Sequence, residues 1–356
     1  MPYPEGIEPK IFTLDRKLYH FVLAAFLLAF AAEASAQDLH YSQRFSSPLN
    51  LSPALAGIYG GEHRIVGNAR NQWQNRNELV GYKSVSASYD TKLNYEPGVT
   101  GFWGVGAQFN YDQAGDSRLS LAQLGLNVSY TQRLSERHLL TAGAQLAGGQ
   151  RRFENADLLF NDQYDASKPQ DDLDPSAEGF SPEETQFYPS LSAGINWRYQ
   201  VRESRTFINI GGGLYHLNTP DVSFFDGSDV SLDQRASAYV LGTYMLADRF
   251  DVIANYTHQW QGPHNEPLAG LRGKFYLMNP LVRTLALQLG AHWRFRDALI
   301  PVVKANIDNW ELGFSYDLNT SDFDIATDTN GGPELSVIYT FQKIRPEICL
   351  LCPEYL

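Results

Sequence analysis

The chain has 356 residues, of which 43% are hydrophobic, 13% aromatic and only 19% charged, and its formal net charge is -12. This acidity excludes nucleic acid as an expected partner, because phosphate-binding chains carry a basic stripe to neutralise the backbone. Low charge with many aromatic residues suits a surface that faces lipid, although a soluble β-sandwich can have a similar composition.

The N-terminus has the parts of a secretory signal peptide. Arg16 and Lys17 precede the apolar run 21–32, and the small-residue site Ala34-Ser35-Ala36 follows at once. The alternative, a membrane anchor, fits less well because the apolar run is short for a bilayer. We therefore expect a signal peptide over residues 1–36. The remainder has no run of about 18 apolar residues, which excludes a helical membrane protein.

Residues 37–62 fit neither a regular strand nor a long helix. Pro48 and Pro53 interrupt any hydrogen-bonded ladder. The apolar residues Leu49, Leu51 and Leu55 indicate that the segment packs against something. We expect a periplasmic or plug-like N-terminal segment here, the alternative being a disordered periplasmic tail.

From about residue 63 the sequence alternates between apolar and polar residues with period two. In 103–112, for example, Trp, Val, Ala, Phe and Tyr alternate with Gly, Gln, Asn and Asp. Such runs are longer than ordinary globular strands and have aromatic residues at their ends, as strands that cross a bilayer do. The pattern predicts strands near 63–75, 82–93, 101–112, 118–134, 138–152, 186–200, 205–216, 235–246, 250–261, 268–277, 284–295, 299–307, 309–319 and 333–342.

These fourteen segments predict an all-β fold, a transmembrane antiparallel outer-membrane β-barrel over 63–342. The count is even, and closure removes the open edge that hydrocarbon does not tolerate. With both termini in the periplasm, the longest connections, near 153–185, 217–234 and 320–332, all follow odd-numbered strands. They are therefore expected to be external loops.

Two of these loops carry many acidic residues. For 153–185, and for Asp322, Asp324, Asp328 and Asn330 in the last loop, the simple interpretation is a solvated surface. The alternative is a docking surface or a divalent-ion site. The spacing in the last loop lacks the full EF-hand pattern and its distal glutamate, so no metal site is predicted.

Charged residues also occur on the polar phase of the strands. We expect them to pair inside the barrel, because buried charges persist only when paired or wetted, and the alternative is a solute channel. These residues are Arg70, Arg198, Arg294, Arg296, Asp90, Asp112, Asp317 and Glu311.

No nucleophile-elbow, zinc-protease or phosphate-loop motif is present. A Ser–His–carboxylate site assembled across strands remains a separate hypothesis, for which Ser190, His216 and His292 are the residues to test. We expect no catalytic activity, no cofactor and no metal.

Both cysteines, Cys349 and Cys352, lie in the expected periplasmic tail 343–356. An oxidising compartment favours a local disulfide between them. A metal site is the weaker alternative, because a partner would have to supply further ligands.

Several short motifs occur in the order found in one known family. They are Gln37-Asp38-Leu39-His40-Tyr41-Ser42-Gln43, Pro48-Leu49-Asn50-Leu51-Ser52-Pro53-Ala54-Leu55-Ala56-Gly57, Arg70-Asn71-Gln72-Trp73, Ser88-Tyr89-Asp90, Asp112-Gln113-Ala114-Gly115, Gly212-Gly213-Leu214-Tyr215-His216, Arg296-Asp297-Ala298, Gly313-Phe314-Ser315-Tyr316-Asp317-Leu318-Asn319, Gly331-Gly332-Pro333-Glu334-Leu335-Ser336 and Cys352-Pro353. In these motifs the chain resembles the PorP/SprF family of type IX secretion membrane proteins of Bacteroidota. One departure from the family pattern is that the chain runs on to Glu354-Tyr355-Leu356.

The resemblance implies a non-enzymatic outer-membrane barrel that works with type IX secretion or gliding components. Such a barrel assists export or surface anchoring of a large secreted, adhesin-like protein through its C-terminal sorting domain. The alternative function is a porin-like or hydrophobic-solute transporter. Candidate client-binding residues are Asp162, Asp165, Asp171, Asp172, Asp174, Phe224, Phe225, Asp322, Asp324 and Asp328. Candidate periplasmic contacts are Gln37, Asp38, Ser42, Gln43, Pro48, Pro53, Cys349 and Cys352.

Overall fold

The computed structural model describes residues 38–72, 81–95, 99–115, 118–154, 164–165, 168–169, 183–224, 230–278, 283–321 and 329–342. The expected signal peptide and C-terminal tail lie outside these residues. Three short helical turns come first: η1 (Arg44–Ser46), α2 (Pro48–Leu51) and η2 (Pro53–Leu55). The strands follow as β1 (His63–Gln72), β2 (Tyr82–Leu93), β3 (Gly101–Ala114), β4 (Leu119–Arg133), β5 (His138–Glu154), β6 (Tyr164–Asp165), β7 (Lys168–Pro169), β8 (Glu183–Gln200), β9 (Phe207–Tyr215), β10 (Arg235–Ala247), β11 (Phe250–Gln261), β12 (His264–Tyr276), β13 (Leu285–Arg294), β14 (Ala298–Ile307), β15 (Trp310–Asn319) and β16 (Asn330–Phe341).

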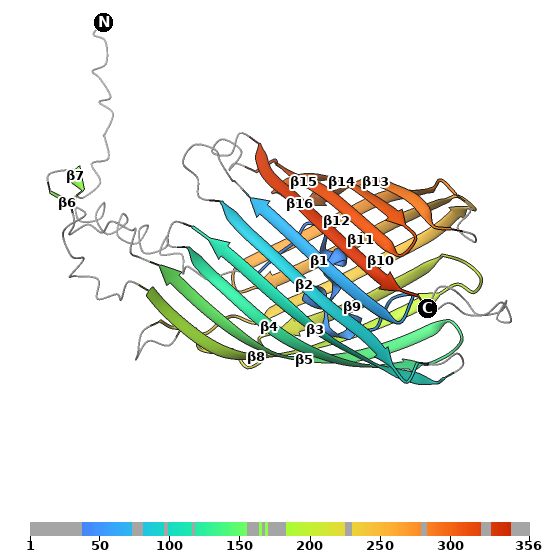
Figure 1. Ribbon diagram of the computed structural model, residues 1–356, viewed down its shortest axis with the longest axis horizontal. Helices are drawn as coiled ribbons and strands as arrows, with labels where there is room; N and C mark the ends of the chain where they lie inside the picture. Colours follow the sequence, from blue (N-terminus) through green and yellow to red (C-terminus); the bar gives the residue numbers. More distant parts are fainter. Residues whose placement is uncertain are drawn as a thin grey trace, which may run out of the picture. The chain divides into compact units, whose positions relative to one another are not determined.

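Fourteen of these strands form one closed antiparallel barrel (Figure 1). Each pairs with its neighbour in the chain, and β1 closes the ring on β16, with His63 opposite Phe341 and Arg70 opposite Glu334. The predicted fold class and strand number are therefore confirmed. The only additional strands within the described residues are β6 and β7. They have two residues each and form a hairpin in the connection between β5 and β8. Among the described residues, no helix is both long and apolar enough to cross a membrane.

The barrel wall exposes its apolar side chains and buries its polar ones. Along β4, Leu124, Leu126 and Val128 are exposed, whereas Asn127 and Ser129, at alternate positions, are buried. A soluble sheet has the reverse arrangement, and outward apolar residues are what lipid requires. Aromatic side chains gather at the strand ends in stacked or tilted pairs: Trp103 with Tyr130, Trp197 with Tyr199, Trp293 with Phe295, and Trp310 with Tyr339.

The two ends of the barrel differ in their connections. The end where β1 begins carries tight turns, such as 248–249 between β10 and β11 and 308–309 between β14 and β15. The opposite end carries the longest connections, 155–182, 216–234 and 320–329, as the sequence pattern predicted. We call these the turn end and the loop end.

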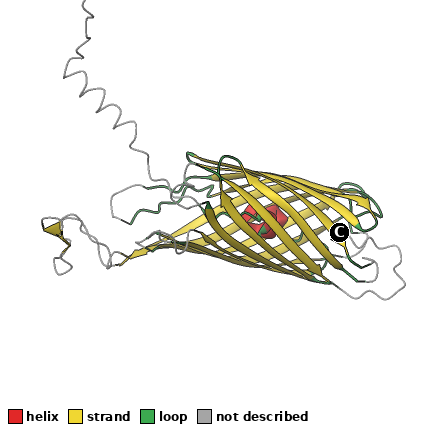
Figure 2. Cartoon of the chain, turned by 90° about the horizontal axis from the view of Figure 1, so that it is seen from above, coloured by secondary structure: helices red, strands yellow, loops and turns green. Residues whose placement is uncertain are grey.

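The N-terminal segment 38–62 runs through the barrel interior, and its helical turns lie within the ring of strands (Figure 2). Pro48 and Pro53 each begin one of the turns, where the missing N–H costs nothing. The side chain of Ser52 accepts a hydrogen bond from the Ala54 N–H and caps η2. We call residues 38–62 the plug segment.

Apolar residues of the plug segment form a small core inside the lumen. Leu51, Leu55 and Ile58 pack with Phe102 of β3 and Tyr239 of β10. The wall has glycines where the plug backbone comes closest. A Cβ at Gly143 would lie 2.5 Å from the Ala54 nitrogen, and one at Gly104 would overlap the Ala56 carbonyl.

The plug segment crosses the lumen from one end to the other. At the loop end, the Asp38 N–H donates to Gln261, the last residue of β11. At the turn end, the Tyr59 hydroxyl donates to the Asp90 carbonyl of β2. The two ends of the described chain, Asp38 and Gln342, therefore lie at opposite ends of the barrel, which departs from the expectation that both lie in the periplasm.

Candidate functional site

Most of the acidic loop residues singled out in the sequence lie outside the described residues. This is so for Asp162, Asp171, Asp172, Asp174, Phe225, Asp322, Asp324 and Asp328, and also for Gln37, Cys349 and Cys352. Asp165 is described only as the backbone of β6. Phe224 lies at the loop end, where its ring meets Phe153 of β5 edge-on at 4.8 Å between centroids.

The barrel wall extends furthest at the loop end along β5 and β8 (Figure 1). β8 pairs with β5 from Glu183 to Tyr199 but with β9 only from Ala193 to Gln200. On this side Leu217 and Asn218 bond the backbone of Leu191 and Pro189, and residues 185–188 have no strand beside them within the described part of the chain. The side chain of Phe187 in this stretch is 69% exposed. Unpaired strand edges readily accept an added strand.

The plug residues that the sequence suggested as periplasmic contacts lie instead inside the lumen. Ser42 and Gln43 are buried, and so are Pro48 and Pro53. A chain that threads the barrel brings these residues against the wall, where machinery outside the barrel does not reach them. Asp38 is partly buried at the loop end.

A cluster of ion pairs and hydrogen bonds fixes the plug near the loop end. Asp317 of β15 lies 2.6 Å from Arg70 and 2.9 Å from Arg294, measured between carboxylate oxygen and guanidinium nitrogen. It also accepts a hydrogen bond from the Ser42 hydroxyl at 2.7 Å. Glu334 of β16 accepts the backbone N–H groups of Ser42 and Gln43, at 2.7 and 2.9 Å.

A second set of contacts holds the next turn of the plug. Arg44 pairs with Glu266 of β12 at 2.7 Å, and Glu266 also lies 2.8 Å from Arg294. Lys304 of β14 donates to the Ser46 hydroxyl at 2.6 Å and pairs with Glu311 at 2.8 Å. Arg44, Glu266 and Lys304 were not predicted from the sequence, because none lies in a recognisable motif.

At the turn end, Arg64 of β1 pairs with Asp90 of β2 at 2.8 Å, and Asp90 accepts the Gly57 N–H of the plug. Most of the expected lumen charges are therefore paired. Arg296 instead lies exposed in the turn between β13 and β14. Arg198 has a glutamine and an aromatic ring as neighbours and makes no ion pair with any described residue.

Two of the three residues proposed for a hydrolase come together with a plug carboxylate. The imidazole of His216 lies between the Ser190 hydroxyl, 2.9 Å from Nδ1, and the Asp38 carboxylate, 2.6 Å from Nε2. Burial raises the pKa of the Asp38 carboxyl, but His216 and Arg235 outweigh this and hold the pKa well below its usual range. His292 belongs to the other cluster, with its Nδ1 2.8 Å from the Ser42 carbonyl.

The Ser190–His216–Asp38 chain has the residue types of a nucleophilic site, but its geometry is that of a tether. Ser190 and His216 are each only 1% exposed, so a substrate does not reach the hydroxyl. The contact joins the start of the plug segment to β8 and to the residue after β9. Together with the clusters described above, this contact attaches the plug segment to the wall at several positions along the barrel axis.

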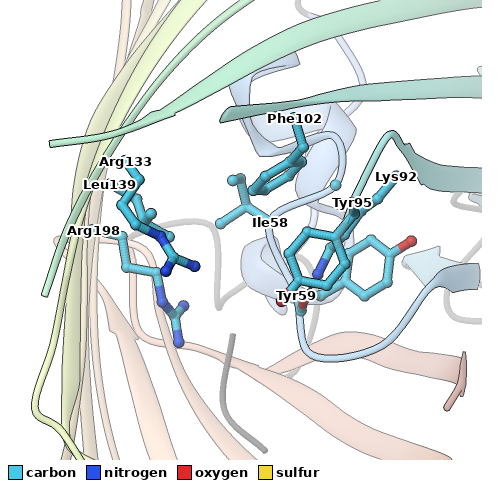
Figure 3. Close-up of a pocket in the computed structure, with 9 residues that line it drawn as sticks. Ile58, Tyr59, Lys92, Tyr95, Phe102, Arg133, Leu139 and Arg198 are labelled. Atoms are coloured by element: carbon cyan, nitrogen blue, oxygen red, sulfur yellow. Dashed lines mark hydrogen bonds between the residues drawn. The ribbon is translucent and has the colours of Figure 1, made fainter. Parts of the chain in front are cut away.

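A cavity lies at the turn end of the barrel, next to Ile58 and Tyr59 of the plug segment. Its volume is about 10 Å³, room for about one water molecule. Figure 3 shows Arg133, Leu139 and Arg198 on one side and Ile58, Tyr59, Lys92, Tyr95 and Phe102 on the other. Among the described side chains that line it, three are basic and none is acidic.

These features define a lipid-exposed, fourteen-stranded outer-membrane barrel whose lumen is occupied by its own N-terminal segment. Residues 33–339 match the family described as type IX secretion system membrane protein PorP/SprF. The chain belongs to this family, which confirms the resemblance seen in the sequence.

Solved structures similar to the chain are outer-membrane barrels. The Ralstonia pickettii toluene transporter TbuX is 11% identical with a TM-score of 0.49, covering 82% of this chain and 92% of its own. The P. putida toluene transporter TodX is 12% identical with a TM-score of 0.47, covering 82% and 93%. The translocator domain of the autotransporter NalP from Neisseria meningitidis is 11% identical with a TM-score of 0.45, covering 92% and 100%. Among curated proteins, no sequence matches this chain.

Proposed function

We propose that this protein assists export or cell-surface anchoring of a large secreted protein by binding that protein's C-terminal domain. The observation that carries the proposal is the occupied lumen. Residues 38–62 fill the interior and are tied to the wall by buried charges. A barrel filled in this way acts through its two ends, as a rigid scaffold that presents binding surfaces.

The loop end is assigned to the cell exterior, because long connections of bacterial barrels usually face outward. The turn end, with the start of β1 and the end of β16, then faces the periplasm. Cys349 and Cys352 in the C-terminal tail are the remaining candidates for contact with periplasmic components of the secretion or gliding machinery. Asp38 and the loops 155–182, 216–234 and 320–329 lie toward the outside.

The extended edge of β8 is the proposed client site. Residues 185–188 offer backbone groups on the β9 side and an exposed aromatic side chain, Phe187. A strand of the client's C-terminal domain can add to such an edge, with main-chain hydrogen bonds giving affinity and side-chain pockets giving specificity. The candidate residues from Asp162 to Asp174 belong to the connection between β5 and β8, and Phe224 and Phe225 to the connection between β9 and β10.

The proposal is tested by isolating the tagged protein from cells in mild detergent and identifying what copurifies. We expect a large secreted protein with a C-terminal sorting domain. Phe187→Asp should reduce its recovery at least fivefold, because the charge disrupts the proposed contact. Leu134→Asp is the matched control, since Leu134 is exposed to a similar degree at the turn end. A folded protein that recovers no such client contradicts the proposal.

A further inference from the structure

The connection that follows β9 continues beside β8 for a short distance and then turns away. The Leu217 N–H donates to the Leu191 carbonyl at 2.9 Å. The side-chain amide of Asn218 then bonds the backbone of β8 twice, accepting the Leu191 N–H at 3.0 Å and donating to the Pro189 carbonyl at 2.9 Å. Asn218 therefore occupies the hydrogen-bonding positions that one residue of an added strand would use.

Beyond Asn218 the edge of β8 is open, but it is short. Backbone groups along a strand point alternately to its two sides, so Thr185 and Phe187 face the same side as Pro189. Neither has a strand beside it there within the described part of the chain. The open edge, 185–188, is shorter than an average strand, which has about five or six residues. A client strand of ordinary length therefore competes with Asn218 for β8.

The same connection also fastens the start of the plug segment. The imidazole of His216 lies between the Ser190 hydroxyl, at 2.9 Å, and the Asp38 carboxylate, at 2.6 Å. Ser190 is the residue between the two that Asn218 bonds. His216 and Asn218 therefore hold one stretch of β8, residues 189–191, and the His216 ring joins that stretch to the plug segment.

The backbone of this connection is strained at two positions. His216 has a φ of 58° and Thr219 a φ of 39°, in the left-handed region that residues other than glycine rarely adopt. The branched side chain of threonine makes this conformation still less favourable. Such conformations persist only where surrounding contacts impose them. The turn 216–219 is therefore expected to leave β8 when the two bonds of Asn218 are lost.

We infer that pairing of a client strand with β8 and release of the start of the plug segment are coupled through Asn218. The inference rests on the proposed function, which assigns a client strand to this edge. A strand that extends past the open edge to Leu191 replaces Asn218 on β8, and the turn 216–219 then moves away from the wall. His216 is thereby withdrawn from Asp38.

The release is local, because the plug segment has other contacts. Asp38 keeps its backbone hydrogen bond to Gln261 and its contact with Arg235, 3.5 Å away. The clusters around Asp317 of β15 and Glu266 of β12 hold the next residues of the plug segment through other strands. Binding at the edge of β8 therefore loosens the plug segment at the loop end without emptying the lumen.

The inference is tested by the accessibility of the plug segment in the purified full chain in nonionic detergent. In a protein that carries Cys349→Ser and Cys352→Ser, Leu39→Cys introduces a single thiol next to Asp38, and the rate of its reaction with a maleimide is measured. Leu39 is only 6% exposed, so the reaction is slow while the plug segment is fastened. Asn218→Ala should raise the rate at least fivefold.

Two controls separate local release from general loosening. Ile58→Cys lies in the part of the plug segment at the turn end and should remain protected in the Asn218→Ala protein. Asn265→Ala, at the loop end, removes an asparagine that bonds within the wall, and should not change the rate at Leu39→Cys. An unchanged rate with Asn218→Ala, or an equal increase at both thiols, would overturn the inference. If Asn218→Ala does not fold, Asn218→Asp, which loses only the donor to Pro189, decides by the same comparison.

The role of the client is tested on the complex isolated in the copurification experiment above. Client-bound protein should react at Leu39→Cys at least fivefold faster than client-free protein, and equal rates would overturn the coupling. Recovery of no client would contradict the proposed function and the client's part in this release. The effect of Asn218→Ala on the client-free protein decides separately whether this connection fastens the plug segment.

Discussion

Arg70 of β1 and Asp317 of β15 form an ion pair of 2.6 Å over the inner face of β16, the strand that lies between theirs in the barrel. Both side chains are almost completely buried. The same carboxylate receives the Ser42 hydroxyl, and the Arg70 guanidinium donates to the His40 carbonyl. One pair of wall residues therefore holds two residues of the plug segment.

Replacing Asp317 with Asn should strongly destabilise the protein. The change leaves Arg70 and Arg294 buried without their shared carboxylate, and breaking a buried pair in this way costs about 3–5 kcal/mol. The measurement is reversible urea unfolding of the barrel in lipid vesicles. Asp308→Asn is the control, since Asp308 pairs with Arg283 at the exposed surface, where a pair is worth at most about 1 kcal/mol. Equal effects of the two changes would contradict a buried network.

Replacing Leu126 with Arg tests the lipid-facing surface. Leu126 is 60% exposed on β4, between the exposed residues Leu124 and Val128. An arginine facing the middle of a bilayer should lower the free energy of unfolding by about 2–4 kcal/mol. Leu134→Arg should cost less than about 1 kcal/mol, because Leu134 is similarly exposed but lies in the turn after β4. Equal costs in lipid vesicles would mean that Leu126 does not face hydrocarbon.

Lowering the pH should loosen the plug. Burial, reinforced by nearby arginines and opposed by Glu266, lowers the pKa of His40 to about 4. The unfolded chain binds a proton near the ordinary value of about 6.5, so the folded state loses stability as the pH falls from about 6.5 to 4. The full loss is about 3 kcal/mol, since one unit corresponds to about 1.4 kcal/mol.

This pH dependence is checked by urea unfolding at pH 7 and pH 4.5. His40→Gln should reduce the difference between the two conditions. His63→Gln, at the start of β1, is the control and should leave the difference unchanged. A wild-type protein that is equally stable at both pH values would show that burial of His40 is not maintained.

The barrel could be predicted from the sequence because the residue pattern within each strand shows which face of that strand is apolar. Alternation with period two identifies the lipid-facing residues from the local sequence alone. The observed bounds of β2 and β11 are accordingly the same as the predicted bounds. β12 begins four residues earlier than expected, at His264, since Pro267 and Glu266 hide the pattern. The hairpin of β6 and β7 has no apolar alternation to reveal it.

The plug contacts could not be predicted, because they join residues that are far apart in the chain. The pair formed by Asp38 and His216 depends on threading of the lumen, which no local pattern encodes. Residues from the short motifs that carry the family resemblance nevertheless come together inside the lumen. Ser42, Arg70 and Asp317 come from three of those motifs and form one cluster.

The central claim is that the N-terminal segment closes the lumen, and planar-bilayer current tests it most directly. We expect the intact protein to carry no steady current. Gly143→Ala should raise the current, because its new Cβ would overlap the plug backbone at Ala54, whereas Gly148→Ala on the same strand meets nothing within 4 Å and should remain silent. A steady, solute-selective current through the unmodified protein would contradict the claim and favour a transporter.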